Sequence, residues 1–156
     1  MSGVRDKVRK IIEKIGAKEA PIQVEDVAKL FSIKILPYDD FPESISGMIV
    51  QESTGVLIGV NSKHAKVRQR FTVAHELGHF LSGHDDLKIV DDLYDKDTVK
   101  EREANEFAAE LLMPYDILKT DVQKGGMDIP ALSKKYFVSE QAMSIRLLKS
   151  GLIDQF

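Results

Sequence analysis

The chain has 156 residues and no cysteine, which excludes disulfide bonds and thiolate ligands and restricts any metal site to nitrogen and oxygen donors. Hydrophobic residues make up 43% and charged residues 30% of the chain, the usage of an ordinary globular domain. The net charge of −3 and the lack of an apolar run near roughly 20 residues argue against a nucleic-acid surface and a membrane span, so we expect a cytoplasmic protein that does not bind nucleic acid directly.

The expected elements of the first sixty residues are helices at 4–15 and 24–31, a strand at 32–38, and the two strands of a hairpin at 47–50 and 55–60. The first helix has apolar residues at helical spacing, and Gly16 is a natural end for it. Charged residues interrupt its apolar positions too often for a signal peptide. The hairpin is indicated by two apolar runs on either side of turn-forming residues.

The expected elements of the remaining chain are helices at 62–83, 99–113 and 114–123, and a helix–turn–helix-like pair between 129 and 152. The helix at 62–83 is apolar on nearly all sides, as a buried helix is. His64, near its beginning, is expected at the surface. The aspartate-rich segment 84–98 lacks the ligand spacing of a calcium-binding loop, and we expect a solvated loop. The functional alternative is an acidic rim that attracts a basic substrate. Ser139 is predicted to cap the last helix.

These elements predict an α+β fold with a small antiparallel sheet or hairpin. We expect a main domain at 1–123 and a C-terminal helical extension at 124–156 packed on it. The extension resembles a helix–turn–helix unit, but its second helix carries only Arg146 and Lys149 as cations, too few for strong contact with phosphates. Its predicted core positions are Val138, Ala142, Ile145 and Leu148.

The motif with the clearest chemistry is His75-Glu76-Leu77-Gly78-His79, within the predicted buried helix. Side chains at i and i+4 of a helix lie one above the other, so both imidazoles reach one point, where zinc accepts nitrogen ligands. Glu76 lies about 100° further round the helix, where its carboxylate can take a proton from a water on the metal. The motif also occurs by chance, but the apolar helix, the close backbone approach that Gly78 permits and a downstream third ligand favour a zinc site.

A catalytic zinc site needs three protein ligands and one open position. The position six residues after His79, where one class of zinc protease has its third histidine, is Asp85. We therefore expect a carboxylate from a separate helix. The candidates in the predicted helix at 99–113 are Glu101, Glu103, Glu106 and Glu110.

Helical geometry ranks these glutamates against the buried stripe of their helix. Glu101 lies about 60° from the centre of the stripe and Glu103 nearer about 100°, so Glu101 is the predicted ligand and Glu103 its rival. Glu106 and Glu110 are expected to face solvent. Asn105 shares an edge of the helix with Glu101 and is placed to accept a hydrogen bond from a ligand histidine, as groups behind zinc ligands commonly do.

The segments RFTVAHELGHFLSGH and EREANEFAAELLMP together resemble the ImmA/IrrE family of metallopeptidases. The resemblance spans about 24–114 and implies a zincin-like peptidase domain of the gluzincin type. It implies His75 and His79 as zinc ligands, Glu76 as the catalytic residue, and a glutamate of the second helix as third ligand. That glutamate aligns best with Glu101.

Members of this family typically cleave a helix–turn–helix repressor and so derepress mobile-element or stress genes, which implies a protein substrate of that kind. Two other functions stay open: a non-catalytic, zinc-stabilised protein-binding module, and a DNA-binding regulator that acts through the C-terminal helices. His84 is a candidate for hydrogen-bonding the substrate. We favour the alternative, in which His84 lies at the end of the helix and faces the negative end of the helix dipole.

Overall fold

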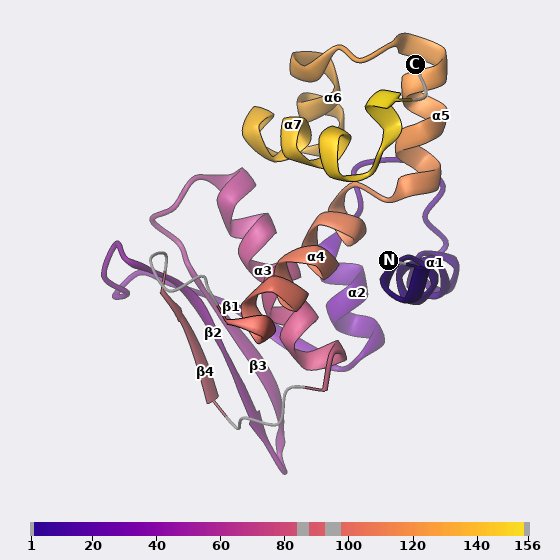
Figure 1. Ribbon diagram of the computed structural model, residues 1–156. Helices are drawn as coiled ribbons and strands as arrows, with labels where there is room; N and C mark the ends of the chain where they lie inside the picture. Colours follow the sequence, from indigo (N-terminus) through magenta and orange to yellow (C-terminus); the bar gives the residue numbers. More distant parts are fainter. Residues whose placement is uncertain (1, 84–87, 93–97, 155–156) are drawn as a thin grey trace. The chain divides into compact units, whose positions relative to one another are not determined.

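A computed structural model describes residues 2–83, 88–92 and 98–154, with only the backbone described for residue 2 and for residues 88–92 (Figure 1). The chain forms two compact units: the first joins Met1–Ile22 with Ala109–Phe156, and the second comprises Gln23–Ala108. The predicted domain boundary at residue 123 stays a prediction. None of the described helices is both long and apolar enough to cross a lipid bilayer.

The second unit contains a four-stranded sheet with the order β1-β3-β2-β4. Its strands are β1 (Ile33–Tyr38), β2 (Ile45–Glu52), β3 (Gly55–Asn61) and β4 (Lys88–Asp92). The predicted hairpin is confirmed, because β2 and β3 pair antiparallel with Glu52 opposite Gly55. The sheet as a whole is mixed, since β1 pairs parallel with β3 while β4 pairs antiparallel with β2.

Strand β4 corrects the expectation of a loop throughout 84–98. Its pairing is supplied by β2, with Met48 opposite Val90 and Val50 opposite Lys88. The segment has only two apolar residues among its five, so its local pattern does not reveal a strand, and the strand forms because a neighbour offers backbone partners. Both hairpin strands consequently lie inside the described sheet, whose outer strands are β1 and β4.

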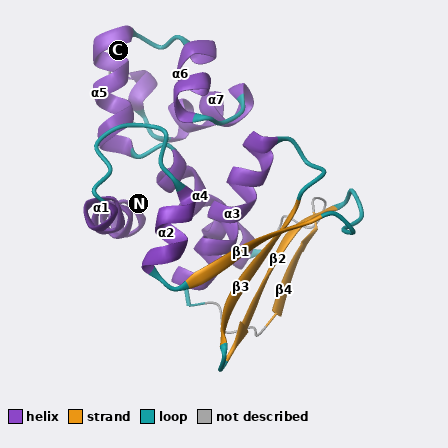
Figure 2. Cartoon of the chain, turned by 180° about the vertical axis from the view of Figure 1, so that it is seen from behind, coloured by secondary structure: helices purple, strands orange, loops and turns teal. Residues whose placement is uncertain are grey.

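Helices of the second unit cover one face of this sheet (Figures 1 and 2). They are α2 (Val24–Leu30), α3 (Lys66–Leu81) and the first part of α4 (Val99–Leu112), a helix that begins in the second unit and ends in the first. Ile49, Ile58 and Leu77 are fully buried in this layer, and burying such side chains contributes about 1.5–3 kcal/mol each. The α+β fold predicted from the sequence is confirmed.

The connection between β3 and α3 is held by a buried polar cluster. The amide of Asn61 donates to the carbonyls of Pro42 and Ile45, at 3.2 and 2.9 Å. His64, expected at the surface, is buried, and its Nε2 lies 3.1 Å from the carbonyl oxygen of Glu43. The expectation was wrong because the segment between β1 and β2 folds over this turn, a contact between distant parts of the chain.

The first unit is helical, with α1 (Ser2–Ile15), α5 (Tyr115–Gly125), α6 (Ile129–Tyr136), α7 (Glu140–Lys149) and a short 3₁₀ turn at Leu152–Asp154. The predicted cap of α7 is confirmed, since the Ser139 hydroxyl accepts a hydrogen bond from the Ala142 N–H at 3.0 Å. Two predicted core positions are wrong: Ile145 and Leu148 are 44% and 62% exposed. The buried face of α7 instead contains Met143, Leu147 and the aliphatic part of Arg146.

Arg146 is buried because it binds the end of α4. Its Nη2 lies 2.7 Å from Glu110 Oε1, and its Nε donates to the Met113 carbonyl at 3.0 Å. Glu110 was expected to face solvent but is 5% exposed, and its other oxygen accepts the Tyr115 N–H at the beginning of α5. Helix periodicity places Glu110 away from the buried stripe of α4, which is why exposure was expected. Periodicity cannot show that α7 supplies a cation on that side of the helix.

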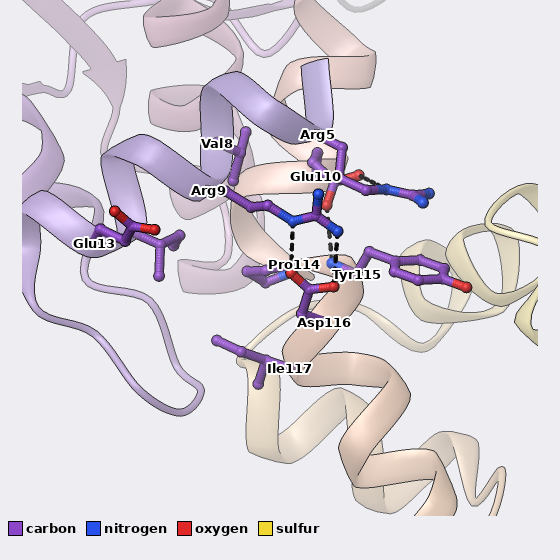
Figure 3. Close-up of a pocket in the computed structure, with 10 residues that line it drawn as sticks. Arg5, Val8, Arg9, Glu13, Glu110, Pro114, Tyr115, Asp116 and Ile117 are labelled. Atoms are coloured by element: carbon purple, nitrogen blue, oxygen red, sulfur yellow. Dashed lines mark hydrogen bonds and ion pairs between the residues drawn. The ribbon is translucent and has the colours of Figure 1, made fainter. Parts of the chain in front are cut away.

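A groove of about 180 Å³ in the first unit lies between α1 and the beginning of α5 (Figure 3). Arg5 stacks over the Tyr115 ring at 3.7 Å, and Arg9 binds Asp116 at 2.7 Å. The hydrogen bond from Arg9 lowers the pKa of Asp116 below its ordinary value. Both arginines of the groove contact groups that line it, so the groove joins α1 to the beginning of α5.

Candidate metal centre

Helix α3 presents His75 and His79 on one side, one turn apart. The residues are 7% and 0% exposed, and their ring centroids lie 4.8 Å apart with an angle of 86° between the ring planes. Burial on a helix fixes both rings, because the i and i+4 side chains share one face and the surrounding helix is packed on all sides. The two imidazoles therefore converge on the same region.

Glu101 of α4 completes the group. Its Oε1 lies 3.0 Å from His75 Nε2, and its Oε2 lies 2.8 Å from His79 Nε2. The backbone N–H of Glu101 donates to the Thr98 hydroxyl at 3.1 Å, which caps the first turn of α4. Thr98 and Glu101 have the spacing of a capping box, but the Glu101 side chain turns to the histidines instead of back to the helix end. The sequence contained this capping signal, and it was missed.

One nitrogen or oxygen atom from each of His75, His79 and Glu101 can be chosen so that all three lie within 4.8 Å of one another. Two imidazoles and a carboxylate are the protein ligands of one class of catalytic zinc site, which keeps its fourth position open. The described residues bring together no other set of three or more histidine, aspartate or glutamate side chains in this way. The donor set therefore fits a zinc ion.

Glu76 provides a second test of that fit. It is 0% exposed, and neither carboxylate oxygen has a hydrogen-bond partner among the described residues. A buried carboxylate without partners costs several kcal/mol, so one that persists in a native site calls for a ligand or a catalytic role. A bound water beside the metal would supply that partner.

Asn105 lies one helical turn after Glu101 and contacts His75 from the other side of the ring. Its Oδ1 is 2.8 Å from His75 Nδ1, so the Nδ1–H donates to the amide oxygen. This bond selects the tautomer in which His75 Nε2 carries a lone pair, the form that binds a metal. Glu101 and Asn105 were expected to share one edge of α4, and both side chains contact His75 from that helix.

The other predicted site residues lie elsewhere. Glu103 and Glu106 are exposed on α4, and Glu103 is not among the three clustered side chains. His84 falls outside the described residues, as do Asp85, Asp86, Asp95 and Asp97 of the expected acidic rim. The roles assigned to all of these residues, including the ligands, stay predictions.

Comparisons with known proteins bear on the family and the fold of the chain. The model of the IrrE N-terminal-like domain, peptidase M78, matches residues 28–148. A solved Mycobacterium tuberculosis transcriptional regulator matches with a TM-score of 0.69 and 16% identity, over 94% of this chain and 46% of that one. The chain thus spans about half the length of that protein, and at this identity the likeness concerns the fold alone. No curated protein matches the chain.

Proposed function

Because the chain belongs to the peptidase M78 family of IrrE N-terminal-like domains, we propose that it is a zinc-dependent endopeptidase. His75, His79 and Glu101 hold the metal, and Glu76 is the catalytic acid–base. The observation that carries the proposal is the convergence of these three side chains beside a fully buried carboxylate with no partner among the described residues.

When bound, zinc acts as a Lewis acid that polarises the scissile carbonyl and lowers the pKa of a water molecule. Glu76 would accept a proton from the attacking water and then pass it to the leaving amine. Asn105 holds the His75 ring in place while the charges shift.

We propose a helix–turn–helix repressor as the substrate, as the resemblance to the ImmA/IrrE family implies. Charge supports a cationic partner of this kind. The unit Gln23–Ala108, which contains the proposed site, has 16 acidic and 10 basic residues, a net charge of −6. Such a unit attracts a basic DNA-binding domain and repels DNA itself.

The substitution Glu76→Gln tests the acid–base role. Glutamine keeps the size of the side chain but cannot accept the proton, so we expect zinc content to match wild type and cleavage to slow about 100-fold or more. Glu106→Gln, at an exposed position of α4, is the matched control and keeps the wild-type rate. A Glu76→Gln protein that cleaves as fast as wild type would rule out the mechanism.

Co-incubation with the product of the neighbouring gene, followed by mass spectrometry, tests the substrate. We expect a single cleavage that a chelator abolishes and added zinc restores. Wild-type protein that holds zinc and binds this partner without cutting it would instead support the non-catalytic binding module.

A further inference from the structure

Helices α3 and α4 touch at Gly78, the residue directly before His79 of the proposed site. A Cβ atom added to Gly78 would lie 2.9 Å from the carbonyl oxygen of Ala104 and 3.0 Å from its Cα. It would also lie 3.2 Å from Cβ of Phe107. Two of these atoms belong to the backbone of α4, so no side-chain rotation relieves the contact, and the whole helix would have to move away.

The touching residue lies beside both site residues that α4 contributes. Ala104 follows Glu101 by three positions and directly precedes Asn105, and it is fully buried. Any displacement of α4 at Ala104 therefore carries the backbones of Glu101 and Asn105 with it. The oxygen atoms of these two side chains lie 2.8–3.0 Å from ring nitrogens of His75 and His79. A displacement of α4 would lengthen these contacts.

We propose that Gly78 is a positioning residue of the metal centre: the missing side chain sets the distance between α3 and α4 at which Asn105 and Glu101 reach the histidines. This inference rests on the proposed function, because it assigns Gly78 a role at that same site. Gly78 has no side chain with which to bind a substrate or a metal, so it acts through the two α4 side chains.

The magnitudes favour an effect on the metal. Ordinary carbon contacts lie at about 3.5–4.0 Å, so Gly78→Ala would push α4 outward by roughly half an ångström or more. Zinc ligand distances tolerate only about 0.2 Å. Glu101 can partly follow by rotating its side chain, whereas the shorter Asn105 cannot, and loss of such a partner typically lowers metal affinity about 10- to 100-fold.

The experiment compares Gly78→Ala with Gly47→Ala, a matched overpacking control in the same unit. A Cβ on Gly47 of β2 would lie 2.6 Å from the Gly59 carbonyl oxygen of β3 and 2.6 Å from Thr72 Cγ2 of α3, and not against α4. Zinc affinity is measured by competition with a chelating dye, fold stability by thermal melting of the metal-free protein, and ligand geometry by the absorption spectrum of bound cobalt(II).

We expect Gly78→Ala to bind zinc at least tenfold more weakly and to shift the cobalt spectrum, while Gly47→Ala lowers the melting temperature but keeps the wild-type affinity and spectrum. Alanine favours helix more than glycine does, so α3 itself is not weakened by the change. Wild-type affinity and spectrum in Gly78→Ala, or equal losses of affinity in both variants, would overturn the inference.

Asn105→Ala keeps the inference testable if Gly78→Ala does not fold, because truncation adds no atoms. We expect it to reproduce most of the affinity loss with the helix spacing intact, and an unchanged affinity would overturn the inference. If wild type itself bound no zinc, the proposed function would fail. If wild type binds zinc, and Asn105→Ala and Gly78→Ala bind it with the same affinity, the role of Gly78 is overturned. The proposed peptidase function would not be affected by that result.

Discussion

Four glutamates on α3 and α4 have different environments, and the environment decides what each can do. Glu76 is buried with no partner among the described residues, and Glu101 contacts two imidazoles. Glu110 is buried against Arg146, and Glu103 is exposed. A carboxylate that contacts two imidazoles suits a metal, and one that is buried without a described partner suits a role in proton transfer. This difference supports the roles proposed for Glu101 and Glu76.

Replacing Glu101 and Glu103 separately tests the third ligand. Glu101→Ala removes a carboxylate that contacts both histidines, so we expect zinc affinity to fall at least 100-fold. Glu103→Ala removes an exposed side chain and is expected to change affinity less than twofold. Isothermal titration with zinc distinguishes them, and the reverse result would transfer the ligand role to Glu103.

At the scale of elements, side-chain bonds between helices hold the first unit together. The Tyr136 hydroxyl at the end of α6 donates to Asp121 Oδ2 of α5 at 2.6 Å, and Lys135 contacts Oδ1 of the same carboxylate at 2.9 Å. Tyr136 is fully buried. Burial first, and then the hydrogen bond to Asp121, raise the pKa of Tyr136 above its ordinary value.

This shift predicts a loss of stability at alkaline pH. The raised pKa means that the folded state favours the neutral phenol, so its contribution is complete below the unfolded pKa near 10 and declines as the pH rises further. We expect the unfolding free energy of wild type to fall more steeply above about pH 10 than that of Tyr136→Phe, by at most about 1.4 kcal/mol per pH unit. Urea unfolding between about pH 8 and pH 11 measures the difference.

Asp121→Asn is the control for the cause of the shift. It removes the carboxylate and keeps Tyr136 buried, and burial is the largest single cause of the raised pKa. This variant should therefore keep much of the pH dependence that Tyr136→Phe loses. Identical slopes in wild type and Tyr136→Phe would contradict the assignment to this residue.

At the scale of the whole molecule, charge and chemistry are divided between the two units. The unit Gln23–Ala108 carries a net −6, and the other unit has 12 basic and 9 acidic residues, a net +3. The proposed metal site joins α3 to α4, so an ion bound there stabilises the acidic unit by linking two of its helices. We therefore expect metal binding and folding of that unit to be coupled.

Metal removal tests this coupling. At a free zinc concentration a hundred times the dissociation constant, binding adds about 2.7 kcal/mol to the stability of the folded state. For a chain of this size, that is a rise in melting temperature on the order of 5–10 °C. We expect chelation to reverse the rise, and Glu101→Ala to show much less of it. A melting temperature indifferent to zinc and chelator would argue against the site.

Most of the elements could be predicted because their signals are local. The apolar periodicity of α1 and α3, the turn between β2 and β3, and the Ser139 cap each lie within a few consecutive residues. A loop was expected where strand β4 lies, and Ile145 and Leu148 were expected to be buried but are exposed. Strand pairing and exposure depend on which neighbours the fold supplies, and a segment's own pattern does not contain them.

The sequence by itself determined the spacing of His75, Glu76 and His79, since a helix places i and i+4 side chains on one face whatever surrounds it. Only the tertiary structure decided that Glu101, and not Glu103, lies against both imidazoles, that Glu76 is buried without a described partner, and that Glu110 meets Arg146. These are contacts between side chains 22 or more positions apart or effects of burial, and both depend on how helices pack rather than on the periodicity of any one of them.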